Sequence, residues 1–377
     1  MPLLSELSDL VGRLQDDLFP YLEESVGPLG PNYRLLVTIF EMAPVTAFLT
    51  AWPSTRGRPP ADRAPLVRAF IAKAVLEVAT TSALIERLQH DKTLRRLCGW
   101  HRVRSVPSEA TFSRAFAEFA ACELPSRMHE ALIVATHKER LVGHISRDAT
   151  AIEAREKPVK VEARKRCRRK RLPQKGEDGW DTVRRLVRQQ SMTLPEMVAD
   201  LPTHCAKGVK PDAKGYKNAW TGYKLHLDTA DGGIPVTAIL TSASLHDSQA
   251  AIPLMTMTAL RITNFYDLMD PSYHAPEIDA ACRALGRIPI VPGQCRRDKD
   301  LKDEMAAEAK ARRNANFQTA EQVRYRERTT AERANARLKD EFGGRFVRVR
   351  GHAKVMCHLM FGILALCVDQ LIRLLGG

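Results

Sequence analysis

The chain has 377 residues, which is long enough for two or three domains with hydrophobic cores of their own. Its 58 Lys and Arg against 44 Asp and Glu give a formal net charge of +14, and this excess predicts a polyanionic partner, nucleic acid first. A membrane surface is the alternative, but neither end of the sequence has a basic amphipathic anchor, so we expect no membrane partner.

The eight cysteines are scattered, with no CxxC pair. This pattern predicts reduced thiols in a cytoplasmic protein and argues against a disulfide framework or a structural zinc site. The apolar run from Val355 to Leu375 is interrupted by polar and charged residues, so we interpret it as a buried terminal helix rather than a membrane span. The N-terminal stretch has early acids and no basic region before an apolar core, which is not the pattern of a signal peptide.

Residues 1–135 are predicted to form helices only. A long apolar-periodic stretch begins after Pro59-Pro60-Ala61-Asp62, a second helix around residues 92–97 ends at Gly99, and Ser108 is a candidate N-cap for a third. Short helices with arginines nearby suit a helix-turn-helix-like DNA-binding domain. They suit an interaction or oligomerisation bundle equally well, and the sequence leaves both interpretations open.

The first convincing strand is predicted over residues 141–146, ending at Arg147-Asp148-Ala149-Thr150. A basic insertion follows at about residues 153–215, in which the segment from Lys157 to Lys175 has ten cations and one acid. Like charges at this density cannot pack into a core, so we expect a mobile segment that contacts phosphate. DNA contact is assigned to five of its cations, namely Arg166, Arg168, Arg169, Lys170 and Arg171.

Residues 180–200 are predicted to be helical, and alternating stretches over 222–230 and 234–244 predict a β-hairpin. A helix, a strand over residues 262–270, a second helix, a short strand and a basic helical tract complete the order. Three strands followed by alternating helices and strands is the order of an RNase H-like α/β fold, a mixed sheet flanked by helices on both faces. We therefore expect an all-α N-terminal domain over residues 1–135 and an α/β domain over residues 139–377.

The stretch from Tyr325 to Lys339 has the composition of a helix. At about 100° per residue, Tyr325, Arg328, Glu332 and Lys339 share an arc of roughly 60°. The apolar side chains on the other side are Val323, Ala331, Ala334, Leu338 and Phe342. One interpretation is an exposed charged face with an i,i+4 pair of Arg328 and Glu332. The other is a carboxylate flanked by cations that faces a polyanion.

Three acids stand out in this order of elements. Asp148 ends the first predicted strand, Asp270 ends the fourth, and Glu332 lies on the late helix. Ends of neighbouring strands in an open α/β sheet converge, so the two aspartates are predicted neighbours, although each could also be a turn residue. Three close carboxylates repel one another, and Mg²⁺ or Mn²⁺ would relieve the repulsion. A pair of such ions, about 3.5–4 Å apart, would suit phosphodiester displacement.

The remaining acids in this region have simpler explanations. Asp267 has the opposite strand parity from Asp270 and is expected on the other face of the sheet. Asp228 and Asp231 are assigned to the hairpin turn, and Asp247 to the capping of the next helix.

These motifs resemble those of a known enzyme family. The pattern Tyr325-x2-Arg328-x3-Glu332-x6-Lys339 is similar, residue for residue, to the signature of the DDE transposases of bacterial insertion sequences. Asp148-Ala149-Thr150 and Asp270-Pro271-Ser272-Tyr273 resemble the two aspartate motifs of that family, although a small residue is usual where Pro271 stands. The segments around residues 84–116 and 245–254 are similar to the family's N-terminal helical domain and to its link from the hairpin to the next helix.

The resemblance implies that Asp148, Asp270 and Glu332 are the catalytic metal ligands, for two ions of Mg²⁺ or Mn²⁺. It also implies that Tyr325, Arg328 and Lys339 face DNA around the scissile phosphate. Arg296 and Arg297, in the basic tract before the late helix, are expected to contact DNA as well.

The function that the resemblance implies is binding of the element's ends, hydrolysis of a phosphodiester bond and transfer of the freed 3′ end to target DNA. A homodimer in a synaptic complex and a cytoplasmic, nucleoid-associated location are the corresponding expectations. Two alternatives stay open: an RNase H-like DNA nuclease that cuts without joining, and a domesticated DNA-binding protein without catalysis. An intact acid triad argues against the second.

Overall fold

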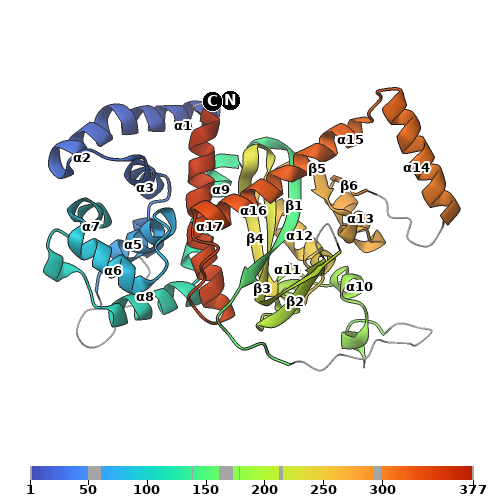
Figure 1. Ribbon diagram of the computed structural model, residues 1–377, viewed down its shortest axis with the longest axis horizontal. Helices are drawn as coiled ribbons and strands as arrows, with labels where there is room; N and C mark the ends of the chain where they lie inside the picture. Colours follow the sequence, from blue (N-terminus) through green and yellow to red (C-terminus); the bar gives the residue numbers. More distant parts are fainter. Residues whose placement is uncertain are drawn as a thin grey trace.

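The computed structural model describes residues 2–49, 61–137, 139–160, 173–177, 179–211, 215–292 and 299–375. Up to residue 137 the described residues form only helices and turns, as predicted (Figure 1). These helices are α1 (Pro2–Arg13), η1 (Leu14–Leu18), α2 (Phe19–Val26), α3 (Pro31–Met42), α4 (Thr46–Leu49), α5 (Arg63–Val75), α6 (Thr81–His90), α7 (Lys92–Cys98), η2 (Val103–Ser105), α8 (Glu109–Ala121) and α9 (Leu124–His137).

A mixed sheet and its covering helices follow. The strands are β1 (Leu141–Glu153), β2 (Ala206–Pro211), β3 (Lys217–Ala230), β4 (Ile234–Ser242), β5 (Thr263–Met269) and β6 (Ile288–Ile290). The helices are η3 (Trp180–Thr182), α10 (Arg185–Gln189), α11 (Leu194–Ala199), η4 (Asp231–Gly233), η5 (Asp247–Ala250), α12 (Ala251–Arg261), η6 (Pro271–Tyr273), α13 (Pro276–Ala284), α14 (Lys299–Asn314), α15 (Ala320–Tyr325), η7 (Arg326–Arg328), α16 (Thr329–Glu341) and α17 (His352–Leu375).

In the N-terminal region, side-chain caps set the start of α5, α6 and α7, whereas Ser108 begins α8 without a side-chain cap bond. The Asp62 carboxylate accepts a hydrogen bond from the backbone N–H of Ala64 and begins α5, and Gly99, with φ of 111°, ends α7. The apolar stretch after residue 62 is two helices rather than one. It breaks because Thr80 caps α6 through the N–H of Ala83, after Glu77 has adopted a φ of 50°. The division near residue 135–139 stays a prediction, although α9 ends and β1 begins there.

The sheet has the predicted hairpin and mixed strand directions. β3 runs antiparallel to both β1 and β4, whereas β5 is parallel to β1 and to β6. The pattern did not predict β2, which lies in the basic insertion and pairs with the first half of β3. The insertion also supplies Leu186 of α10 and Met197 of α11, which pack with Met255 of α12 and with Ile278 of α13. This part of the insertion therefore belongs to the fold.

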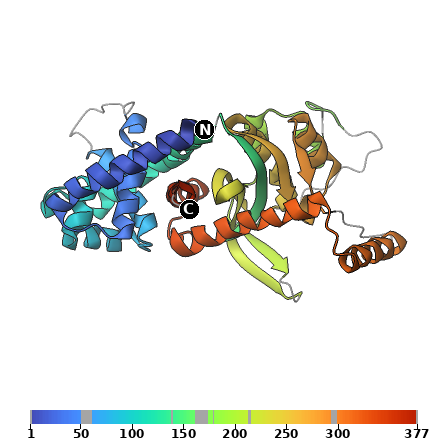
Figure 2. The same cartoon turned by 90° about the horizontal axis from the view of Figure 1, so that it is seen from above.

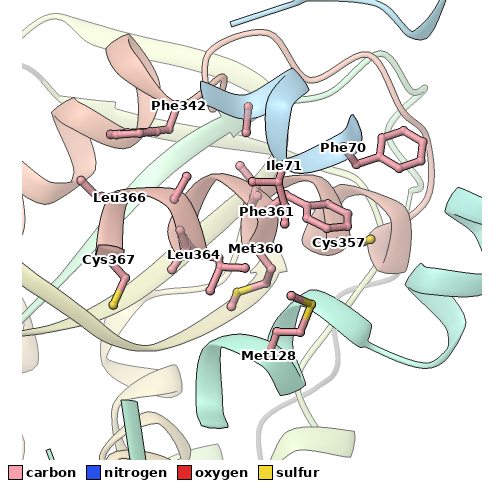
Figure 3. Close-up of a cluster of buried hydrophobic side chains, with 14 of the residues drawn as sticks. Phe70, Ile71, Met128, Phe342, Cys357, Met360, Phe361, Leu364, Leu366 and Cys367 are labelled. Atoms are coloured by element: carbon pink, nitrogen blue, oxygen red, sulfur yellow. The ribbon is translucent and has the colours of Figure 1, made fainter. Parts of the chain in front are cut away.

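The two faces of the sheet are covered by different helices. α16 and α17 lie over the face of β1, β3 and β4 that includes Leu225 and Leu240, whereas α12 lies against the opposite face. Figures 1 and 2 show α17 between the N-terminal helices and the sheet. Its Phe361 ring stacks on Phe70 of α5, with ring centroids 5.9 Å apart (Figure 3). One hydrophobic core thus spans the N-terminal helices and the sheet.

α17 has the length and apolar composition of a membrane span, but 78% of its most apolar window is buried inside the protein. The prediction of a buried terminal helix is confirmed. The six described cysteines are free, as expected for reduced thiols, while Cys167 and Cys295 lie outside the described residues.

A fully buried arginine holds three strands together on the α12 face. The guanidinium of Arg147 in β1 donates two hydrogen bonds, of 2.8 and 2.7 Å, to the carboxylate of Asp228 in β3. It donates a third, of 3.2 Å, to Asp267 in β5. Burial would lower the pKa of Arg147, but the two carboxylates keep it above its usual range. Thr258 of α12 donates to Asp228 at 2.7 Å, so the helix is tied to the same network.

β2 and the first half of β3 form a two-stranded arm, residues 206–211 and 217–222, which leaves the main sheet at Gly222. Figure 2 shows this yellow-green pair projecting past α16. Gly222 has φ of 151°, and a Cβ there would lie 2.2 Å from the carbonyl oxygen of Ile152. Only glycine permits this close approach of the two backbones, and the arm turns there toward the face that α16 covers.

The buried network predicts a large stability effect. Arg147→Met leaves Asp228 and Asp267 buried without their partner, so the free energy of unfolding should fall by about 3–5 kcal/mol. Chemical denaturation followed by tryptophan fluorescence measures the loss. Arg283→Met is the matched control, because Arg283 forms an exposed ion pair with Asp279 and should change stability by at most about 1 kcal/mol. Equal effects of the two substitutions would contradict this role for Arg147.

Candidate active site

Asp148 and Asp270 lie side by side on neighbouring parallel strands. β1 and β5 pair in register up to Arg147 and Met269, so the next residue of each strand is one of the two aspartates. Neighbouring strands are about 4.8 Å apart, and residues in register on parallel strands point to the same face. The electrostatic repulsion between the two carboxylates contributes to raising the pKa of Asp148, after the larger effect of burial.

The structure corrects one detail of this pair. Asp148 was expected at the end of its strand, but β1 continues to Glu153 because the longer β3 remains paired with it up to Gly222. What ends near Asp148 is the pairing with β5. Asp270 directly follows the last residue of β5 and is the N-cap of η6, where its carboxylate accepts a hydrogen bond of 2.7 Å from the N–H of Ser272. Pro271 fits this geometry as the first residue of η6.

The signature with Tyr325, Arg328, Glu332 and Lys339 follows a continuous helical path, but the path is not one α-helix. α15 ends at Tyr325, η7 is a 3₁₀ turn, and α16 starts at Thr329. On the apolar side, the four expected side chains of α16 and its C-cap are buried, namely Ala331, Ala334, Leu338 and Phe342. Val323 was expected with them but is 51% exposed, because α15 precedes the part of the path that contacts β1 and β3.

The guanidinium of Arg328 lies among all three predicted acids. It forms an ion pair with Glu332, and its Nη1 lies 3.8 Å from Oδ1 of Asp148. It also lies 5.9 Å from the centre of the Tyr325 ring. Burial would lower the pKa of Arg328, but Tyr325, Glu332, Asp148 and Asp270 together raise it. The four side chains and Asp270 therefore form one cluster, and Arg328 neutralises part of its negative charge.

Asp148 is the most enclosed acid of the cluster. Burial raises its pKa, while the charges of Lys210 and Arg328 lower it. Oδ2 of Asp148 accepts a hydrogen bond of 3.1 Å from the side-chain amide of Asn335, a buried residue of α16. The carboxylate of Glu332, by contrast, is half exposed. The cluster is thus closed on the side of the sheet and open on the side of α16 that faces solvent.

Sequence reasoning assigned no site role to three residues near the cluster, although it quoted one of them, Tyr273, as part of a motif. Asn335 had a signal, since it is a polar residue three positions after Glu332 within an otherwise apolar stripe. Tyr273 is fully buried, and its pKa is raised well above the usual range by burial and then by nearby acids that include Asp148 and Asp270. Lys210 had no signal, because nothing in the insertion indicates that the arm turns back toward Asp148.

The other acids have structural roles. Asp267 points to the opposite face, as predicted, and pairs with Arg147. Asp231 lies in the hairpin turn as predicted and accepts a hydrogen bond from the N–H of Gly143. Asp228 was wrongly assigned to the turn: it is a buried residue of β3 that bonds to Arg147. Asp247 pairs with Lys224 at 2.6 Å, and its helix shows no side-chain cap.

Lys339, the last residue of the signature, lies on α16 beyond the cluster and is half-buried. Burial lowers its pKa first, the positive charges of Arg345 and Lys210 lower it further, and the carboxylates of Glu153 and Asp340 partly oppose this shift. Seven other cations that were assigned to DNA contact lie outside the described residues. They are Arg166, Arg168, Arg169, Lys170, Arg171, Arg296 and Arg297.

The donor chemistry of the cluster fits a hard divalent cation. Asp148 and Asp270 are two oxygen donors in register on one face, repelling each other, with the carboxylate of Glu332 on the helix above them. Within the described parts of the chain, no three Asp, Glu, His or Cys side chains are arranged as a finished ligand set. The ion pair between Arg328 and Glu332 directs the third carboxylate to the guanidinium instead.

Two protein families match the chain. Residues 144–368 match the family described as "Transposase DDE domain", whose fold is RNase H-like, and residues 21–118 match "Transposase domain (DUF772)". No curated protein and no solved structure matches. The first match contains Asp148, Asp270 and the complete signature, and it covers more than half of the sequence. The chain therefore belongs to the family of transposases with a DDE domain.

Proposed function

We propose that this transposase binds the ends of an insertion sequence, hydrolyses a phosphodiester bond at each end, and transfers the freed 3′-hydroxyl to target DNA. The observation that carries the proposal is the register of β1 and β5, which puts Asp148 and Asp270 side by side beneath Glu332. These three carboxylates are the proposed catalytic residues.

Asp148, Asp270 and Glu332 would hold Mg²⁺ or Mn²⁺, in a pair of sites. When bound, the ions supply Lewis-acid activation of the attacking oxygen and charge stabilisation of the leaving oxygen. The contribution of the protein is to hold the acids in place. Asn335 orients Asp148 through their hydrogen bond, and Ser272 with its backbone N–H orients Asp270. Glu332 becomes available once Arg328 turns from it to a DNA phosphate, which offers the guanidinium a better bidentate partner.

The proposed path of the DNA strand follows the polar side of the helical path from α15 to α16. Tyr325 and Arg328 lie at the acid cluster, and Lys339 lies about 10 Å beyond Glu332 along the helix, at 1.5 Å per residue. No described carboxylate forms an ion pair with Lys339, so its charge is available to a phosphate. Electrostatic stabilisation of the transition state by such preorganised cations would supply much of the rate.

The N-terminal helices are the proposed reader of the element ends, since their match is to a separate transposase domain. The basic segment of the insertion would add contacts to phosphate. Pairing of two ends requires two active sites, so a homodimer in a synaptic complex is part of the proposal, as is action at the nucleoid in the cytoplasm.

The two alternatives are separated by one assay with pre-cut ends. A transposase joins the 3′ end to target DNA, whereas a nuclease that does not join gives no joined product. A domesticated DNA-binding protein gives neither cleavage nor joining. The complete set of acids and the matching cations favour the transposase.

Glu332→Gln should abolish cleavage of a DNA fragment that includes the element's end, because the neutral amide removes a charged ligand while keeping the shape of the side chain. A sequencing gel should show that cleavage is lost, and an electrophoretic mobility shift should show that DNA binding is retained. Glu321→Gln, an exposed residue of α15, is the matched control and should cleave normally. Cleavage by Glu332→Gln at the wild-type rate would contradict the proposed catalytic role of Glu332.

Metal binding should also be visible without any reaction. Mg²⁺ or Mn²⁺ at a hundred times its Kd should raise the free energy of unfolding by about 2.7 kcal/mol, because it binds only the folded chain. Thermal denaturation with and without the ion measures the rise in Tm. Asp148→Asn should lose most of the rise, whereas Asp279→Asn, on the exposed face of α13, should keep it. An equal rise in wild type and Asp148→Asn would place the ion elsewhere.

A further inference from the structure

A basic groove of about 450 Å³ lies beside the acid cluster, and apart from Lys339 its lining residues have no part in the proposed chemistry. The end of β1, the last turns of α16 and the segment after α16 form its walls. Its charged and aromatic lining consists of Glu153, Arg155, Lys339, Arg345, Phe346 and Arg348. The volume falls within the range of pockets that take one small ligand, and one nucleotide is of that size.

The wall of the groove after α16 is held firmly by the backbone. Gly343 adopts φ of 74° at the end of the helix, and the N–H of Gly344 donates to the carbonyl of Leu338 at 2.9 Å. The chain then runs extended, with Val347 buried and its neighbours Phe346 and Arg348 exposed. This alternation directs an aromatic ring and a guanidinium outward from a fixed backbone. The ring of Phe346 is 49% exposed.

The charges of the groove suit an anion. Four cations and one acid line it, and of the cations only Arg345 is paired with a described carboxylate, that of Asp340. Arg155, Lys339 and Arg348 form no ion pair with any acid in the described parts of the chain. Lys210 of the arm adds a further positive charge near Lys339. Cations left unpaired in this way are available to phosphate oxygens.

The groove lies further along β1 and α16, the two elements that also position Asp148 and Glu332. Ala151, in its floor, follows Asp148 by three residues of β1, or about 10 Å at 3.3 Å per residue. On α16, Lys339 follows Glu332 by two turns, again about 10 Å. A strand whose scissile phosphate lies at the acids therefore reaches the groove within one or two nucleotides.

We propose that this groove binds one unpaired nucleotide of the cleaved DNA strand, with its base against Phe346 and its phosphates on Lys339 and Arg348. The inference rests on the proposed function. An unpaired base is the occupant because stacking on the exposed ring of Phe346 requires a base with a free face. In a duplex, each base is already covered by its neighbours. Distorted or frayed DNA next to the cut is thus the preferred substrate.

The test uses a fluorescein-labelled 24-base-pair duplex of arbitrary sequence and the same duplex with four central T·T mismatches. Fluorescence anisotropy should show tighter binding of wild type to the mismatched probe. Phe346→Ala should weaken binding to that probe by roughly fivefold or more, the scale of one base–aromatic stack, and leave the matched duplex unchanged. Phe346→Trp should keep the preference. Phe317→Ala removes a ring of similar exposure, 58%, and should have no effect.

A second probe replaces the four mismatched thymidines of one strand by abasic sites, and wild type should bind it no better than Phe346→Ala binds the thymidine probe. Equal binding of the mismatched probe by wild type and Phe346→Ala, with normal binding of the matched duplex, would overturn the inference and leave the proposed function standing. If wild type binds neither probe, DNA binding itself fails, and the proposed function fails with it. Unchanged Tm of each variant confirms that the substitutions leave the fold intact.

Discussion

The buried ion pairs of Arg147 with Asp228 and Asp267 are the constraint on which the active-site face depends. They join β1, β3 and β5 from the α12 side, where neither the guanidinium nor its partners reach water. Because successive residues of a strand point to opposite faces, fixing Arg147 on one face directs Asp148 to the other. The neighbouring strand follows the same rule, since Asp267 and Asp270 are three positions apart and therefore point to opposite faces. One face of the sheet therefore has the buried ion pairs of Arg147, and the opposite face has the acid cluster.

α17 supplies the second constraint. It is covered by the sheet on one side and by α5 and α8 on the other, so the N-terminal helices and the sheet share one core (Figure 3). Leu338 of α16 belongs to this core, which fixes the height of α16 above β1 and β3. The polar side of α16 is consequently a rigid platform. Its side chains, rather than its backbone, have the freedom to exchange partners.

Arg328 is a side chain at the acid cluster with partners to exchange. It is paired with Glu332 and lies near Asp148, so it takes the position of a counter-charge for acids that would otherwise repel one another. A phosphate group offers the same guanidinium a planar, bidentate alternative. In the proposed function, binding of the DNA strand and release of Glu332 are then one event. The basic groove that Lys339 lines has four cations and one acid, Glu153, so it too offers unneutralised positive charge to phosphate.

Sequence by itself determined the class of each region and indicated the candidate acids. Helix-only patterning up to residue 137, the hairpin of β3 and β4, the buried α17 and the opposite parity of Asp267 all follow from local periodicity, and the structure has them. The signature and the two aspartate motifs pointed to the family by their resemblance to its motifs, and the family match over residues 144–368 agrees with it.

Only the tertiary structure decided which residues meet. The register of β1 and β5, the role of Asp228 in β3 and the contact of Asn335 with Asp148 depend on pairings between residues 81 to 187 positions apart along the chain, which no local pattern encodes. The turn of the arm at Gly222 is of the same kind: a glycine in a strand is a weak signal until a second backbone lies 2.2 Å from where its Cβ would be. Val323 failed as a core residue for the converse reason, because its apolar character matched the pattern but about half of the residue stays exposed. Periodicity specifies which face of an element is apolar, and long-range packing specifies what covers it.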